Sequence, residues 1–225
     1  IKEYYISHLF FDANVDILTP QNNKKLDQLA NLLLIYPKIT AELSCFELPT
    51  GQKTFNLYFS IKKTEKAAEY LAGKGIPRSR LLLKGYGSSF PLVAKPVSNN
   101  ISPLYQKLNQ RLEIALHDYE SEPVIIDIEG IKVPENLQDP KGVKFSTLSN
   151  QLFYSVQIAS ISQILQNQAI ESVEELFIEV ENSSGNYLYM AGMIPTFKEA
   201  ENLMSSLIDL GFPDARIVPY INGIR

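Results

Sequence analysis

Hydrophobic and polar positions in the first half of the chain alternate between strand-like and helix-like spacing. Aromatic and β-branched residues over 4–11 predict a strand. Thr19 and Pro20 are typical of a helix start, and leucines at helical spacing extend that helix to Pro37. The elements predicted after it are a strand at 39–43, a loop at 45–55, a helix from Ser60 to Gly73, a strand at 81–84, a loop at 88–105 and a strand at 111–116. This β-α-β-α-β-β order favours an α+β sandwich with helices on one face of a sheet.

The second half predicts a smaller α+β unit that follows an extended segment. Prolines and a short apolar run at 124–128 suggest that residues 119–150 are a linker, one strand of which pairs with a neighbour. Thr196 and Glu199 fit a capping box at the start of a helix that ends near Gly211. The other predicted elements are strands at 153–159, 187–193 and 216–220 and a helix at 161–177 with Glu171, Glu174 and Glu175 on its solvent side. We therefore predict two domains, 1–118 and 151–225, joined by the linker 119–150.

Composition adds an asymmetry of charge between these halves. The chain has 225 residues and a net charge of -4, but residues 1–118 hold 15 basic and 10 acidic side chains, and the remainder carries a balance of −9. The halves either simply differ in composition, or attract each other, or the basic half faces an acidic partner. Nucleic acid is not the predicted partner, because no cluster of basic residues is interleaved with aromatic ones.

Candidate chemistry is sparse. A single cysteine, Cys45, excludes an internal disulfide and a zinc site built from several cysteines. The two histidines, His8 and His117, lie in or at the end of predicted strands, without the spacing of metal ligands or of a catalytic triad. The longest apolar run is far too short to span a bilayer, and we expect no transmembrane segment, metal, cofactor or catalysis in this chain. The start at Ile1 suggests a processed form or a segment of a longer protein.

Residues 5–116 resemble the OmpA-like peptidoglycan-binding domain. The resemblance rests on the spacing from Gly51 to Asn56, Ser60 and Lys63 and on a Gly-Tyr-Gly turn at 85–87 that precedes Asn109-Gln-Arg111. In that family an aspartate and an arginine hold the diaminopimelate of the peptide stem. Here those two positions fall on Leu48 and Lys63. The resemblance thus implies a degenerate pocket, whose positions in this chain are Glu47, Leu48, Asn56, Lys63 and Arg111. Leucine cannot accept a hydrogen bond from an ammonium, and lysine lacks the paired donors of arginine, although Glu47 could substitute for the aspartate after a shift of one residue.

Residues 152–225 resemble a SPOR-like domain of the type found in cell-envelope proteins of the Bacteroidetes lineage. The resemblance rests on the segments 154–159, 187–192, 196–200 and 210–223. It implies recognition of peptidoglycan glycan strands by one face of the sheet. Strand alternation places the candidate glycan-face residues together: Ser155, Gln157, Leu188 and Met190. The alternative is that the linker or a partner chain covers Leu188 and Met190.

Two hypotheses for function follow. The first is a non-enzymatic periplasmic module that binds peptidoglycan and tethers an outer-membrane protein assembly to it. The second is a scaffold subunit of an outer-membrane complex, for secretion or assembly, in which the degenerate pocket is reused for protein contacts. Both predict a periplasmic, outer-membrane-associated protein with outer-membrane partners.

Overall fold

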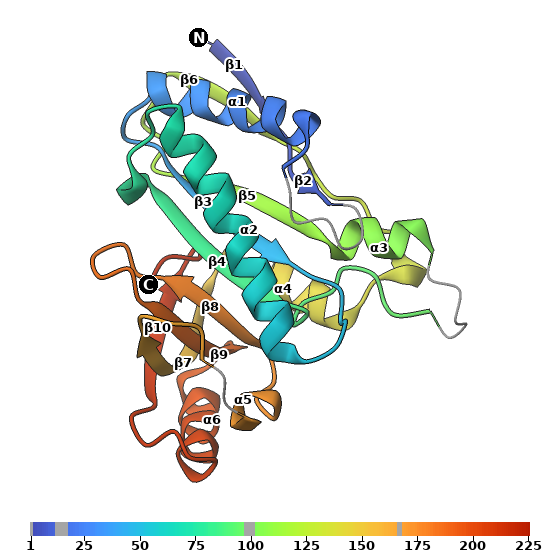
Figure 1. The fold of residues 1–225 in the computed structure, drawn as a ribbon, viewed down its shortest axis with the longest axis vertical. Coiled ribbons are helices and arrows are strands. Elements are labelled where there is room, and N and C mark those ends of the chain that lie inside the picture. The colour runs from blue at the N-terminus through green and yellow to red at the C-terminus, as the bar shows by residue number, and fades with distance from the viewer. Residues whose placement is uncertain (1, 12–17, 97–101, 166–167) are drawn as a thin grey trace.

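A computed structural model describes residues 2–11, 18–96, 102–165 and 168–225 and shows a mixed α+β fold (Figure 1). Eight strands form one sheet in the order β10-β7-β9-β8-β4-β3-β5-β2. Its strands are β2 (Leu9–Phe10), β3 (Thr40–Phe46), β4 (Leu81–Gly87), β5 (Arg111–His117), β7 (Leu152–Ile161), β8 (Leu176–Val180), β9 (Tyr187–Ile194) and β10 (Arg216–Ile221). A separate parallel pair joins β1 (Lys2–Ile6) to β6 (Val124–Ile128).

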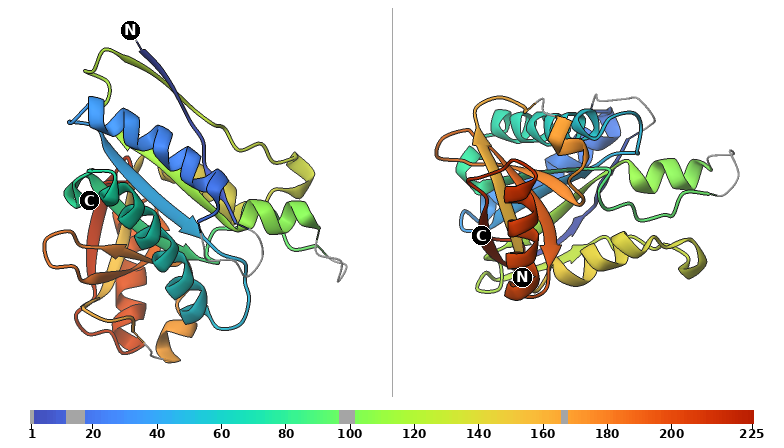
Figure 2. Two further views of the ribbon diagram at one scale, coloured as in Figure 1. Left: turned by 45° about the horizontal axis from the view of Figure 1, so that its top comes forward. Right: turned by 90° about the horizontal axis from the view of Figure 1, so that it is seen from below.

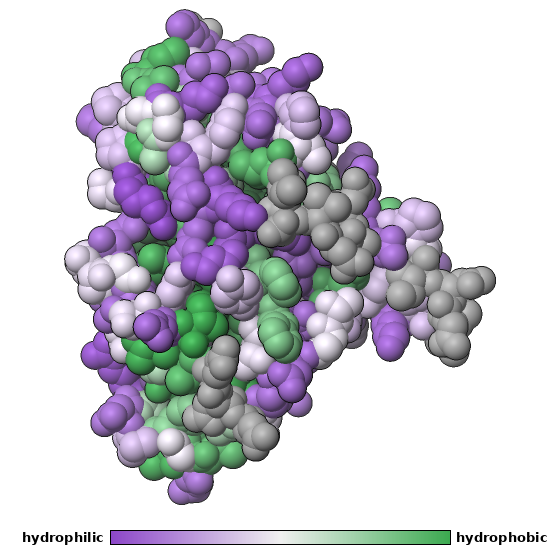
Figure 3. All heavy atoms as spheres, viewed as in Figure 1, coloured by the Kyte–Doolittle hydropathy of each residue, from purple (hydrophilic) through white to green (hydrophobic). Residues whose placement is uncertain are grey.

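Helices cover both faces of this sheet (Figure 2). They are α1 (Pro20–Ile35), α2 (Lys53–Gly73), α3 (Pro103–Asn109), α4 (Pro140–Leu148), α5 (Gln168–Glu171) and α6 (Phe197–Asp209), with short 3-10 turns at Arg78–Arg80 and Glu135–Leu137. Helices α1 and α2 lie on one face of β3, β4 and β5, and α4 lies on the opposite face. In the space-filling view, hydrophilic side chains predominate over the upper half of the molecule, and hydrophobic ones gather in its lower half (Figure 3).

Two apolar clusters, one on each face of the sheet, hold the layers together. The larger one packs α1 and α2 onto β3 and β4 and continues into the second half through Val156, Ile178 and Tyr189. The smaller one is aromatic, with Phe46 and Tyr86 stacked at 4.9 Å between ring centres and Phe145 of α4 set edge-on against both. Because both clusters include residues of both halves, burial of apolar surface ties the two halves into one core.

The sheet continues from one predicted domain into the other through a short antiparallel ladder. Lys84 and Gly85 of β4 pair with Glu179 and Ile178 of β8. Side chains add to this junction, since the Ser89 hydroxyl donates to the Leu176 carbonyl at 2.7 Å. The domain boundaries at 118 and 150 remain predictions, but the strands on either side of them belong to one sheet.

Several elements agree with the sequence-based prediction. The helix that begins after Thr19 is confirmed, and the Thr19 hydroxyl accepts a hydrogen bond from the backbone N–H of Asn22 at 3.1 Å. The capping box is confirmed too, because the Thr196 side chain accepts from the Glu199 N–H and donates to the Glu199 carboxylate. The strand predicted at 4–11 is interrupted at Ser7 and His8, between β1 and β2.

Other predicted elements are wrong. The helix predicted over 161–177 is reduced to α5, and its last residues begin the strand β8. The second helix begins at Lys53 rather than Ser60, inside the segment predicted to be a loop. The segment 119–150, interpreted as an extended linker, contains α4 as well as the predicted strand β6, and the loop predicted at 88–105 gives way to α3 from Pro103.

Candidate ligand sites

The predicted pocket positions meet at one end of the sheet, where the loop after β3 faces α2. The Lys63 ammonium lies 2.5 Å from the Glu47 carboxylate, and both side chains are buried, at 3% and 6% exposure. Gln110 donates to the other oxygen of Glu47 at 3.1 Å. Lys63 also lies 4.8 Å from the centre of the Phe11 ring. The charges of this site therefore satisfy one another, and no free cation or anion is presented to a ligand.

Leu48 and Asn56 shape the same loop. Leu48, at the position expected for the family aspartate, packs in an apolar cluster with Val93, Tyr105 and Leu108. The Asn56 amide, oriented to satisfy its neighbours, donates to the Leu48 and Thr50 carbonyls at 3.2 and 2.8 Å and is buried. These contacts fix the loop against α2, and the role of either residue in binding a ligand remains a prediction.

Arg111 is fully enclosed. Its guanidinium lies 3.7 Å above the centre of the Phe46 ring, and its Nε donates to Glu113 at 2.6 Å. The Leu108 carbonyl accepts from a second nitrogen at 3.2 Å. Burial lowers the pKa of Arg111, and Glu113 opposes that shift. With its donors used internally, Arg111 fastens α3 to the sheet in this structure.

A second buried charge network lies where the two halves meet, and no sequence pattern predicted it. Lys84 is 1% exposed and lies 3.1 Å from Glu42 and 3.9 Å from Glu179. It also donates to the Gly223 carbonyl at 2.5 Å, while the Tyr220 hydroxyl donates to Glu179. Burial raises the pKa of Glu42, but Lys84 and His117 outweigh it and bring the pKa to about 2. Residues of β3, β4, β8 and the C-terminal turn are thereby held together.

Glu171 caps a helix, whereas the sequence placed it on the solvent side of a predicted helix. Its carboxylate accepts hydrogen bonds from the backbone N–H groups of Lys53 and Thr54 at 2.8 and 3.0 Å. The N-cap residue Gln52 makes no side-chain capping bond of its own. Burial raises the pKa of Glu171, but these bonds outweigh it and lower the pKa below its usual value. A residue of the second half therefore caps the N-terminus of α2 in the first half.

The four candidate glycan-face residues are all buried. Leu188 and Met190 lie in the aromatic cluster with Phe145 and Leu148 of the segment 119–150. The Ser155 hydroxyl donates to the Ala191 carbonyl at 3.0 Å. The structure thus favours the alternative in which the linker covers Leu188 and Met190, because α4 occupies that face.

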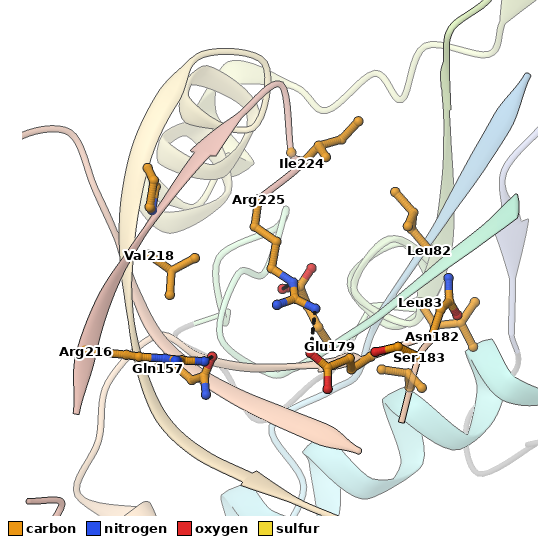
Figure 4. A pocket seen from close by; sticks show the side chains of 14 residues that line it. Leu82, Leu83, Gln157, Glu179, Asn182, Ser183, Arg216, Val218, Ile224 and Arg225 are labelled. Atoms are coloured by element: carbon orange, nitrogen blue, oxygen red, sulfur yellow. Dashed lines mark hydrogen bonds and ion pairs between the residues drawn. The ribbon is translucent and has the colours of Figure 1, made fainter. Parts of the chain in front are cut away.

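Gln157 borders a groove between β10 and the turn after β8. The groove has a volume of about 540 Å³. Figure 4 shows Gln157 beside Arg216 on one wall, Asn182 and Ser183 on the other, and Arg225 reaching towards Glu179 between them. Arg216 donates to Gln157 at 3.1 Å, and Arg225 lies 3.6 Å from Glu179. Of the four predicted glycan-face residues, Gln157 borders this groove, although it is itself 7% exposed.

Within the part of the chain that the structure describes, no three or more His, Cys, Asp or Glu side chains are grouped so that they could hold a metal ion. None of the helices in that part is both long and apolar enough to cross a membrane.

Comparison with known proteins gives partial matches. No protein-family model matches the chain. Outer membrane protein A of Klebsiella pneumoniae is 30% identical over 95 residues, covering 41% of this chain and 28% of its own length. Outer membrane protein A of Yersinia pseudotuberculosis is 31% identical over 121 residues, covering 51% and 34%. Outer membrane porin F of Pseudomonas fluorescens is 24% identical over 106 residues, covering 47% and 31%. The chain spans about a third of the length of these relatives, and its similarity to the OmpA family is weak.

Solved structures match at low similarity. The peptidoglycan-associated lipoprotein from Burkholderia pseudomallei aligns with 48% of this chain and 88% of its own at 19% identity and a TM-score of 0.41. The C-terminal domain of Helicobacter pylori MotB aligns with 63% of this chain and 93% of its own at 16% identity and a TM-score of 0.41. The curated relatives named above are outer-membrane proteins. The SPOR-like resemblance of the second half stays a prediction.

Proposed function

We propose that this chain is a non-enzymatic periplasmic module that binds peptidoglycan and tethers an outer-membrane protein assembly to it. The observation that carries the proposal is that Glu47, Lys63 and Gln110, distant in sequence, meet at one end of the sheet where the OmpA-like pattern puts the ligand pocket. The 30–31% identity to outer membrane protein A over up to 121 residues supports it.

The pocket itself argues for a changed mode of binding. A zwitterionic diaminopimelate needs an anion for its ammonium and a forked donor for its carboxylate. Glu47 and Lys63 neutralise each other at 2.5 Å. A ligand entering there would have to break a buried ion pair, which costs several kcal/mol. Contact with the wall is therefore expected at surfaces beside these positions.

Sedimentation with purified sacculi tests this function. The protein is incubated with intact sacculi, and with sacculi stripped of peptide stems by an amidase, at about 150 mM salt, where the Debye length is about 8 Å. We expect the protein to pellet with intact sacculi. Loss of pelleting on stripped sacculi would assign binding to the stems, and retention would assign it to the glycan. No pelleting with either preparation would refute the proposal.

The second candidate, a scaffold subunit of an outer-membrane complex for secretion or assembly, is favoured by the same buried pair. The buried Glu47–Lys63 pair can stabilise the fold, while the residues around this pocket contact a partner protein. This function predicts a stable complex with an outer-membrane protein after crosslinking in native envelopes, together with no pelleting on sacculi. A strictly monomeric, uncrosslinked protein would refute it.

A further inference from the structure

A cavity of about 410 Å³ lies where β2, the start of α1 and α3 come together, the region at the right of Figure 1. It is bordered by Phe10, Phe11, Thr19, Gln21, Asn22, Lys25, Pro103, Gln106 and Lys107. It includes none of the predicted pocket positions. Phe11 nevertheless touches both sites, because its ring also contacts Lys63. A volume of this size suits a small ligand or one group of a larger one.

Two ammonium groups lie near the same aromatic ring, that of Phe10, which borders this cavity. Lys25 Nζ lies 5.5 Å and Lys107 Nζ lies 5.3 Å from the centre of the Phe10 ring. Lys25 also donates to the His8 carbonyl at 2.6 Å, which fixes its position. Burial lowers the pKa of Lys25, Glu129 opposes the shift and Lys107 adds to it. The two positive charges are therefore close enough to repel each other.

The described residues that line the cavity offer little to neutralise these two charges. No Asp or Glu is found among its described lining residues, and neither lysine forms an ion pair with a described carboxylate. Glu129 is near enough to influence Lys25 but does not line the cavity. The other polar lining residues that the structure describes are neutral and include the amide groups of Gln21, Asn22 and Gln106. Paired ammonium groups with amide donors around them are suited to an anion.

We infer that this cavity binds a compact group with two negative charges, of the dicarboxylate or phosphate kind, held between Lys25 and Lys107. The inference rests on the proposed function when the anion is taken to be the carboxylates of a peptidoglycan stem peptide. The cavity lies in the basic half of the chain, because residues 1–118 carry 15 basic and 10 acidic side chains, and this positive balance favours such carboxylates. The same charges could bind a free phosphate compound, and the experiment separates the two sources.

The test is calorimetric titration of the whole chain with two probes, the tripeptide L-Ala–γ-D-Glu–diaminopimelate and inorganic phosphate. The variant Lys25→Gln/Lys107→Gln removes both cations. The matched control is Lys24→Gln/Lys198→Gln, which removes two exposed lysines, one of them on the same helix, and leaves the same net charge. Lys107→Gln alone leaves the Lys25 bond to His8 intact, so it reports on the site even if the double variant folds poorly.

We expect the tripeptide to bind the unmodified chain and the control equally. Affinity should fall roughly tenfold or more for each lysine removed, because each charge-assisted hydrogen bond contributes that much. Binding should also weaken as salt is raised. Binding of phosphate but not of the tripeptide would keep the anion site and overturn its assignment to the wall peptide. Equal affinity of Lys107→Gln and the control for both probes, or no binding of either probe, would overturn the inference.

The sacculus assay distinguishes failure of this inference from failure of the proposed function. If Lys25→Gln/Lys107→Gln pellets with sacculi as well as the control does, wall binding stands and this cavity is not its site. If the unmodified chain does not pellet while phosphate still binds in a lysine-dependent way, the anion site stands and the peptidoglycan function fails.

Discussion

Lys84 should be among the most costly residues to replace, because its ammonium compensates two buried carboxylates. Replacing Lys84 by Met keeps much of the volume of the side chain but removes the buried cation that Glu42 and Glu179 share, and it leaves the Gly223 carbonyl without its donor. Among the described residues, the basic partners that remain are His117 for Glu42 and Arg225, which is partly exposed, for Glu179. Removing one partner of a buried ion pair typically costs about 3–5 kcal/mol. Since small domains unfold with about 5–15 kcal/mol, this loss would be a large fraction of the total.

The assay is urea denaturation at neutral pH of Lys84→Met, Glu42→Gln and the double variant. We expect the double variant to recover part of the loss of Lys84→Met, because it removes one of the stranded charges. The loss should also shrink towards acidic pH, since protonation neutralises the carboxylates. A loss below about 1 kcal/mol for Lys84→Met, or no recovery in the double variant, would refute the reasoning that unpaired charge dominates.

Three further predictions concern stability. In the unmodified protein, the lowered pKa of Glu42 contributes stability that is complete above pH 4.5 and is lost as the pH falls towards about 2. Urea titrations should therefore show the free energy of unfolding declining across that pH window, and a flat profile would contradict this. Gly85→Ala places a methyl group 2.7 Å from the Ile61 backbone nitrogen and should cost about 1–3 kcal/mol, whereas the control Gly73→Ala meets open space and should be neutral or slightly stabilising. Glu171→Ala removes the cap of α2 and should lower the free energy of unfolding by about 0.5–2 kcal/mol, measured by thermal unfolding. The control is Glu174→Ala, which removes a nearby carboxylate that does not cap α2 and should change stability little.

Local signals in the sequence were sufficient where structure is decided locally. Thr19 with Pro20, and Thr196 with Glu199, identify the starts of α1 and α6 because a capping side chain bonds within its own first turn. The second helix was different. Its start at Lys53 is capped by Glu171, from a distant part of the chain, and no residue before Lys53 marks it.

The strand β8 shows why the rest could not be predicted. Its five residues, Leu176–Val180, form a short apolar run that periodicity alone cannot distinguish from the end of a helix. Its identity as a strand depends on pairing with β4 and β9 on either side. Such pairing between distant segments is not encoded in any local pattern of a single sequence.

The candidate pocket itself remains a prediction, but the sequence anticipated part of its geometry. The resemblance selected Lys63 and placed Glu47 next to the expected acidic position, and the structure brings these two together. The sequence placed Leu48 at the position of the family aspartate but could not anticipate its packing against α3, because that helix itself was not predicted. The lysines of the cavity between α1 and α3 were missed for the same reason, since they converge only once both helices are in place.

The two-residue ladder between β4 and β8 determines whether the two halves of the chain can be separated. A strand that loses its neighbour exposes unpaired backbone N–H and C=O groups, which can pair with another chain. Here, separating the first half from the second would strip a neighbour from β4 and from β8 and uncover the aromatic cluster beneath α4. We therefore expect the two halves to be stable only when they are expressed together in one chain.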